Sequence, residues 1–286
     1  MIAICKRNLK LYFSNKATVF FSLLGALIVF GLYLLFLRKN MVAQFNQLEN
    51  GAAVADFWVL GGLLATTSIT TSFTALGQLI KDKAENKFMD FVITGKKIVA
   101  LIFGYFLSAF IIAVLMQSVV LMVCLSYFYL QDHYYFTIEI ALKLAGIILL
   151  SALNATAINL VVCSFIQSDS TLRTISSLLG ALAGFMCTAY LPVGSFSGPA
   201  LTILKLLPAS YVSSSFRRIL LLPLLQSQPK DDLTSLKEYL GIGYRWHTQL
   251  TGASLDLSVL ILSTLLCFTV LFLCYKKIKQ VRLASV

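Results

Sequence analysis

Long apolar stretches that contain almost no charge constrain this chain more than any other feature of its sequence. A membrane hydrocarbon core about 30 Å thick is crossed by about 20 consecutive apolar residues in an α-helix. Six stretches reach this length, and the first, ATVFFSLLGALIVFGLYLLFL, has no charged residue. The sequence therefore predicts an all-α polytopic membrane protein, a single transmembrane domain over 1–286 with six spans at 17–37, 55–80, 98–128, 140–166, 173–191 and 256–275.

The composition excludes the soluble function classes. Only 12% of the 286 residues are charged and 58% are hydrophobic, whereas a soluble chain carries about 25% charged residues. So few charges cannot cover a soluble surface, which excludes a cytosolic enzyme, a nucleic-acid-binding domain and a disordered protein. The net charge of +11 is typical of a membrane protein whose lysines and arginines gather on the cytoplasmic side.

The distribution of basic residues predicts the orientation. Lysines and arginines are concentrated in the N-terminal segment, in the connection 81–97 and in the C-terminal tail, whereas the short connections of the opposite side hold few. The connection 192–254 is about as long as the loops that escape this rule. We therefore expect both termini to be cytoplasmic.

Residues 1–16 are too short to cross the membrane, but they are amphipathic. Ile2, Cys5, Leu9 and Tyr12 share one helical face, opposite a basic face. This pattern predicts an amphipathic helix that lies in the membrane interface. A frayed start of the first span is the alternative.

Two further segments lie between the fifth and sixth predicted spans. Segment 196–222 is apolar but is interrupted by Pro199 and Pro208, and each part is too short to span. This pattern predicts a re-entrant helical hairpin, whose irregular backbone must be buried in protein or line a wet cavity. Segment 229–254 is polar and is expected to be extracellular, with one short helix at DDLTSLKEYL.

The connection 81–97 is unusually apolar for a cytoplasmic loop. Phe88, Met89 and Phe91 are bracketed by charges on both sides. Two interpretations are open: a short helix on the membrane surface, or a docking helix whose apolar ridge fits a groove on a cytosolic partner.

Polar residues form a stripe along the second predicted span. Thr67, Thr71, Thr74 and Gln78 recur at spacings of four, three and four residues, which places them on one helical face. Such a stripe faces a partner helix or a path for an amphiphile. Alternatively, each hydroxyl donates to the carbonyl four residues earlier and only permits tight packing.

Small residues form a second stripe, on the fifth predicted span. Ser177, Gly180, Gly184 and Thr188 recur along one face, and the two glycines form G-x-x-x-G. This spacing allows close approach of helices. The contact could lie within the chain or between two copies.

The chemistry that would make this chain an enzyme is absent from the sequence. It contains no H-E-x-x-H motif, no cysteine pair with metal spacing and no phosphate-binding G-x-x-x-x-G-K-[ST] loop. The spans are nearly empty of ionisable residues, which argues against an ion-coupled transporter. We therefore expect no catalytic residue, metal or cofactor on this chain, and energy for transport must come from another chain.

The order of these features resembles the membrane subunits (permeases) of type-2 ABC exporters, the class of drug, antimicrobial-peptide and polysaccharide exporters. Members often read E-R-G-T-L-E-x-L-L-x-T-P after the second span, and AENKFMDFVITG departs from this at Lys87, where glycine is usual, and Gly95, where proline is usual. The residues that fit are Glu85, Met89, Asp90, Phe91 and Thr94 in this loop, and Pro208, Tyr211 and Arg217 or Arg218 in the hairpin.

This resemblance implies a permease of the bacterial cell membrane, paired with a second permease copy as a homodimer or heterodimer. Two cytosolic ATPase subunits would hold ATP and Mg. The second and fifth spans would line the dimer seam and the path for a peptide, lipid or drug. The ATPase contacts would be Glu85, Phe88, Met89, Asp90 and Phe91. The alternative function is a membrane-anchored interaction or immunity protein without transport.

Overall fold

Helices dominate the computed structural model, which describes residues 1–284 apart from 46, 47, 49, 96, 133–136, 226–229 and 247–248. They account for 87% of the chain. The described part contains one small sheet, in which β1 (Arg245–Trp246) pairs with β2 (Gln249–Leu250) in antiparallel register. The predicted helical class is therefore confirmed.

Among the described residues, five helical stretches are long and apolar enough to cross a membrane. The first joins α2 (Lys16–Leu32), the π-helical turn η1 (Tyr33–Leu37) and α3 (Arg38–Gln44). The others belong to α4 (Gly51–Ala84), α6 (Ile98–Asp132), α7 (Ile138–Phe165) and α12 (Ala253–Ala284). These five contain or largely overlap the predicted spans 17–37, 55–80, 98–128, 140–166 and 256–275.

The predicted span 173–191 falls on α8 (Asp169–Met186), which is not among these five helices. Asp169, Arg173 and several hydroxyl residues make the first half of α8 too polar. The helix also ends five residues earlier than expected, because the chain turns at Thr188, which has a positive φ of 49°. The count of six spans is therefore not confirmed by the fold.

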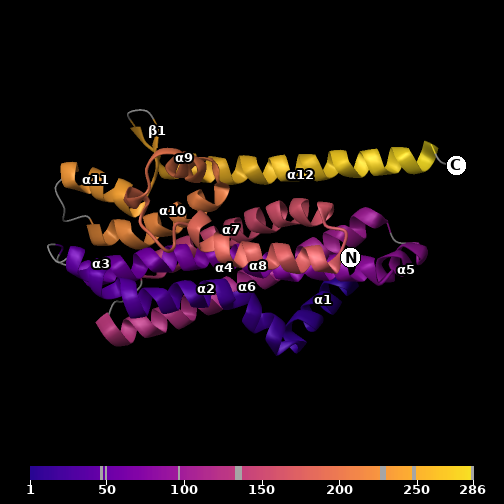
Figure 1. Ribbon diagram of the computed structural model, residues 1–286, viewed down its shortest axis with the longest axis horizontal. Coiled ribbons are helices and arrows are strands. Elements are labelled where there is room, and N and C mark those ends of the chain that lie inside the picture. Colours follow the sequence, from indigo (N-terminus) through magenta and orange to yellow (C-terminus); the bar gives the residue numbers. More distant parts are fainter. Residues whose placement is uncertain are drawn as a thin grey trace.

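Helix α4 forms the centre of the bundle (Figure 1). It packs against α2, α6, α7, α8 and α10 (Pro208–Leu221), and almost all of its residues are buried. Small residues allow this crowding: a Cβ at Gly62 would lie 2.6 Å from the Cβ of Ala189. By contrast, α12 lies at the edge and exposes many large apolar side chains, as expected of a lipid-facing helix.

The remaining elements lie at the two ends of the bundle (Figure 1). Helix α5 (Lys87–Ile93) marks one end, called here the α5 end, where α1 (Ile2–Ser14) also begins. Helix α11 (Lys230–Leu240) and the β-hairpin mark the opposite end, called here the α11 end. The short 3-10 turns η2 (Val193–Ser195) and η3 (Leu222–Leu225) flank the segment that carries α9 (Gly198–Leu206) and α10.

Segment 196–222 folds as two helices with a break between them, as its prolines predict. Pro208 begins α10 and has no N–H to continue α9, and it holds Leu207 in an extended conformation. The Tyr211 hydroxyl closes the break by donating to the carbonyl of Lys205 at 2.7 Å. The segment 229–254 contains α11 and the strands β1 and β2, with residues 229, 247 and 248 outside the described part.

Helix α1 uses a slightly different face from the predicted one. Cys5 and Tyr12 are buried, as expected, but Ile2 is exposed and Asn8 is buried in its place. The Asn8 amide donates to the Ser108 hydroxyl at 3.3 Å, so a polar contact with α6 sets the rotation of α1.

We predict that Gly62→Ala destabilises the protein, because the added methyl group would overlap the backbone of Ala189. Overpacking of this kind costs about 1–3 kcal/mol. The control is Gly31→Ala, also within a helix, where a Cβ would meet nothing within 4 Å; it should be neutral or stabilising by up to about 1 kcal/mol. Thermal unfolding in detergent compares the two variants. Equal unfolding temperatures would contradict the close contact between α4 and Ala189.

Candidate functional site

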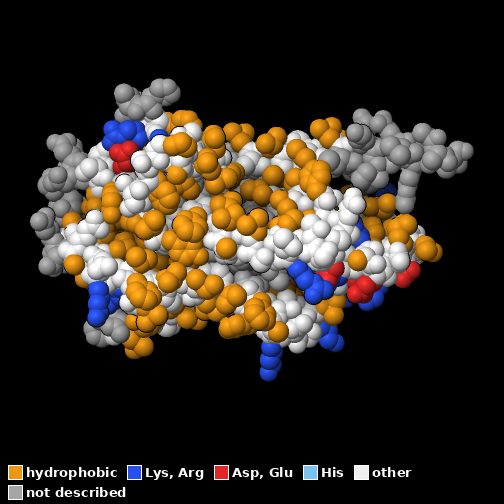
Figure 2. Space-filling view, in the orientation of Figure 1, with side chains coloured by type: hydrophobic (Ala, Val, Ile, Leu, Met, Phe, Trp, Pro, Cys, Tyr) orange, Lys and Arg blue, Asp and Glu red, His pale blue; other side chains and the backbone are white. Residues whose placement is uncertain are grey.

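A groove of about 1210 Å³ runs between α2 and α8, with α4 as its floor and α1 at one end. We call it the α2–α8 groove. Residues that line it include Asn15 directly before α2, Gly25 on α2, Gln78 and Lys81 on α4, and Arg173 on α8. In Figure 2, the face on which α2 and α8 lie is mostly apolar, with charged side chains toward its ends. The groove therefore joins an apolar interior to polar and charged residues.

Each of the two predicted stripes lines this groove with the half that lies nearer the α5 end. Thr74 and Gln78 line it from α4, and Ser177 and Gly180 line it from α8. Two helices separated by about 100 residues of sequence thus place polar and small side chains around one space. The sequence indicates each stripe separately, but only the packing brings them together.

The other half of the α4 stripe, Thr67 and Thr71, has a packing role. Thr67 and Thr71 are buried, and each hydroxyl donates to its own helix, to the carbonyls of Leu63 at 2.7 Å and Thr67 at 2.6 Å. Thr74 also donates within α4, to the carbonyl of Thr70 at 2.8 Å, although it lines the groove. This pattern agrees with the packing interpretation for the hydroxyls, so Gln78 is the stripe's strongest polar group.

The small-residue stripe divides in a similar way. A Cβ at Gly184 would overlap the ring of Tyr190, so this glycine makes room within the chain. A Cβ at Gly180 would meet nothing within 4 Å, because Gly180 faces the open groove. Thr188 lies beyond the end of α8 rather than on it, since the turn that follows Met186 removes it from the helical face.

A buried aspartate, which the sequence analysis missed, joins three elements, α1, α4 and α6, at the α5 end. Asp82 on α4 accepts two hydrogen bonds from Arg7 on α1, at 2.7 and 3.0 Å. It also accepts one from Tyr105 on α6 at 2.5 Å and one from Gln78 at 2.8 Å. The bond to Asp82 raises the pKa of Arg7 above its ordinary value, so the guanidinium stays charged. The signal in the sequence was an aspartate between two lysines, Lys81 and Lys83, directly after the predicted span 55–80.

Helix α5 is attached to this centre by one side only. Phe88 is buried against Tyr105, with ring centroids 6.4 Å apart, and the Arg7 guanidinium lies 5.4 Å from the Phe91 ring centroid. Of the residues expected to contact a partner, Phe88 therefore packs inside the chain and Phe91 is partly buried. The residues left on the outer side, all exposed, are Glu85, Met89 and Asp90.

Glu85 has a partner within this segment. Its carboxylate forms an exposed ion pair with Lys87 at 2.5 Å, and the hydrogen bond to Glu85 raises the pKa of Lys87. Ile93, at the end of α5, is 81% exposed. The outer side of α5 thus combines exposed apolar and acidic side chains.

Arg217, on α10, is fully buried in the bundle and has no acidic partner in the described part of the chain. Its guanidinium donates to the Thr188 hydroxyl at 2.6 Å, the Thr188 carbonyl at 2.7 Å and the Trp58 carbonyl at 3.2 Å. It also stacks on the Trp58 ring at 4.6 Å. Carbonyl acceptors and a π-face replace a carboxylate here, so Arg217 links α4, α10 and the turn after α8.

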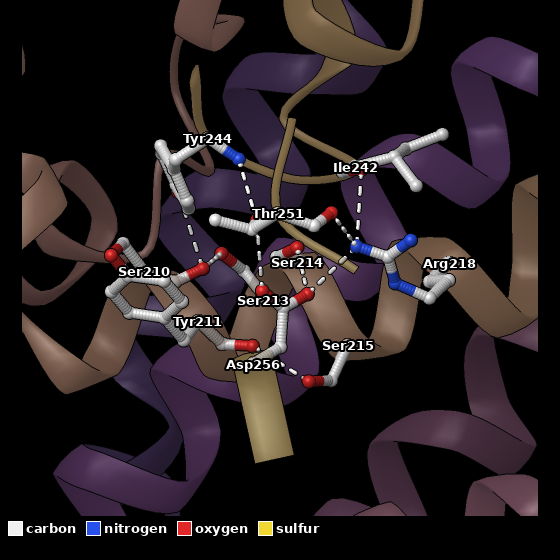
Figure 3. A network of polar contacts seen from close by, with 10 residues as sticks. All are labelled: Ser210, Tyr211, Ser213, Ser214, Ser215, Arg218, Ile242, Tyr244, Thr251 and Asp256. Atoms are coloured by element: carbon white, nitrogen blue, oxygen red, sulfur yellow. Dashed lines mark hydrogen bonds and ion pairs between the residues drawn. The ribbon is translucent and has the colours of Figure 1, made fainter. Parts of the chain in front are cut away.

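Arg218 belongs to a separate polar network (Figure 3). Its guanidinium donates to Asp256 on α12 at 2.9 Å and to the Thr251 carbonyl at 3.0 Å. The same carboxylate accepts from the Ser214 hydroxyl at 2.8 Å. Pro208 and Tyr211 lie earlier on α10, where they shape the break after α9.

The expectation that the spans are nearly empty of ionisable residues was wrong in one respect. Asp56, Asp82 and Asp256 all lie within candidate spans and are fully buried. Each is neutralised by an arginine from another element; for Asp56 this is Arg38, at 2.9 Å. Because each arginine stands outside the apolar core of the span, the sequence alone did not reveal the pairing.

No group of three histidine, cysteine or acidic side chains could hold a metal in the described part of the chain. Comparison of the chain with models of protein families, with curated proteins and with solved structures finds no match in any of the three. The fold and this geometry therefore define the class: a helical protein with five helices able to cross a membrane.

We predict that Asp82→Asn lowers stability by about 2 kcal/mol or more, since it leaves Arg7 without its counter-charge. Breaking a fully buried pair costs about 3–5 kcal/mol, and the cost is smaller here because Arg7 is partly exposed. The control is Glu139→Gln, which removes the exposed pair with Lys143 and should cost less than about 1 kcal/mol. Unfolding of the detergent-solubilised protein measures both, and similar losses would contradict a structural role for Asp82.

Proposed function

We propose that this chain is the permease subunit of an ATP-driven exporter, coupled to a separate cytosolic ATPase. The observation that carries the proposal is that α5 packs against the bundle with one side and exposes the other side. One side is fixed to the bundle through Phe88, while Met89, Asp90 and Ile93 are exposed on the other. An apolar ridge of this kind is how a helix docks into a groove on a partner protein.

The proposed topology places α5 and both termini on the cytoplasmic side. The basic residues near the α5 end support this orientation by the positive-inside rule. Helix α8 runs alongside α4 and contacts it, which supports counting it as a sixth crossing, shielded by protein where it is polar. In the same proposal, the break between α9 and α10 lies within the outer half of the membrane.

The contacts at Asp82 support a route by which an ATPase could act on the groove. Arg7 bonds Asp82 and stacks on Phe91, so α1, α4 and α5 share one set of interactions. Gln78 bonds the same carboxylate and lines the groove one turn away. A movement of α5 driven by ATP hydrolysis would therefore shift the groove's floor and its α1 end together.

A second permease copy, identical or related, would complete the path. On α8, Leu178, Leu182 and Phe185 are exposed beside the groove, and a second copy or lipid must cover such a surface. ATP and Mg would be held by the two ATPase copies. The substrate in this proposal is an amphiphile, because the groove joins polar and apolar walls.

We predict that Ile93→Asp removes co-purification with the ATPase and its stimulation, because a charge would interrupt the apolar ridge. Ile138→Asp is the matched control, since Ile138 is equally exposed, 82% against 81%, but lies at the α11 end. Pull-down from mild detergent, with mass identification and ATPase assay, measures the effect. Recovery of the wild-type chain without any ATPase would instead favour a membrane-anchored interaction or immunity protein.

The orientation has its own test, with single cysteines at two exposed positions. We expect a membrane-impermeant maleimide to label Ser195→Cys in intact cells, because η2 lies toward the α11 end. Lys10→Cys, on α1, should react only after permeabilisation. The opposite pattern would reverse the topology and contradict a cytoplasmic α5.

A further inference from the structure

The α2–α8 groove changes in character along its length. Lys81, Asp169 and Arg173 line it at the α5 end, where α4 finishes and α8 begins. Farther along α2 and α8, Ile28, Leu179 and Phe185 line it instead. The charged end and the apolar interior belong to one continuous space.

The size of this space matches one membrane leaflet. Arg173 and Phe185 lie on the same helix, and at about 1.5 Å per residue they are about 18 Å apart along its axis. One leaflet contributes about 15 Å of hydrocarbon. The groove volume of about 1210 Å³ exceeds the range of about 300–1,000 Å³ usual for drug-sized ligands. These dimensions suit a lipid-like molecule that lies parallel to the helices.

The charged end offers a lysine that pairs with no carboxylate of the described chain. Lys81 has no ion pair within the described part of the chain, whereas Arg173 is paired with Asp169 through Oδ2. Lys81 therefore leaves one positive charge without a counter-charge at this end of the groove, where an anionic group would be attracted.

From these contacts we infer that the groove binds an anionic phospholipid. The phosphodiester faces Lys81 and Arg173, and the acyl chain lies among Ile28, Leu179 and Phe185. This inference rests on the proposed function for the groove's role as a transport path, and it names the class of amphiphile. Phosphatidylglycerol has the net negative charge that Lys81 attracts, whereas phosphatidylcholine has no net charge.

Native mass spectrometry of the full chain, with added phosphatidylglycerol or phosphatidylcholine, tests the headgroup. The wild-type protein should retain phosphatidylglycerol preferentially, because only this lipid of the two carries a net negative charge. Lys81→Gln should weaken retention about fivefold, the factor expected for one basic residue at an anionic lipid. Lys10→Gln is the control, an exposed lysine on α1 outside the groove, and should leave retention unchanged. Equal retention of the two lipids would overturn the inference.

A second pair of variants tests the acyl chain. A Cβ at Gly180 would meet nothing within 4 Å, and Gly180 lines the groove, so Gly180→Leu places its side chain in the groove. Gly146→Leu adds the same side chain in open space outside the groove and is the matched control. Only Gly180→Leu should reduce lipid retention, and equal effects would overturn the inference.

Excess glycerol 3-phosphate distinguishes a lipid from a free phosphate. The phospholipid should remain bound, and its displacement would show a simple phosphate site and overturn the inference. None of these measurements needs the ATPase. A failure here leaves the coupling through α5 unaffected, and loss of the ATPase partner leaves lipid retention unaffected.

Discussion

The burial of helix α4 is the constraint on which the rest of the structure depends. A helix surrounded on all sides must have every polar side chain satisfied by its neighbours. Asp56 and Asp82 stand near its two ends, and each receives an arginine from another segment, Arg38 and Arg7 respectively. A buried carboxylate fixes its partner because an unpaired charge there would cost several kcal/mol. The two pairs thus define where α3 and α1 attach to the bundle.

The same burial explains the small and hydroxyl residues of α4. Hydroxyls that donate to their own helix remain satisfied without outside partners, and they occupy little space. Gly61 and Gly62 let Arg217 and Ala189 approach the backbone directly. Arg217 then links α4 to the turn at Thr188, where α8 ends. Tight packing at one end of the bundle and the open groove farther along α8 therefore follow from the same helix.

The groove and α5 are the two places where the chain departs from complete internal packing. Helix α5 exposes apolar side chains although its other side is fixed by Phe88. The groove exposes Gln78, Lys81 and Gly180 beside buried walls. They lie at the same end of α4, joined through Asp82, Arg7 and Phe91. This connection is the physical basis for assigning a partner to α5 and a ligand to the groove.

By itself, the sequence determined the helical class, the five helices able to cross a membrane in the described part of the chain, and the break at Pro208, because apolar length and proline geometry are local properties. It also identified the stripes on 55–80 and 173–191 as unusual. Only the tertiary structure decided which stripe residues line one groove: Thr74, Gln78, Ser177 and Gly180 do, whereas Gly184 and Thr188 do not. It also decided that three buried aspartates are each paired with an arginine. These outcomes depend on which helices become neighbours and on their rotation. Residues far apart in the sequence set both, as Arg7 and Asp82 do across 75 positions.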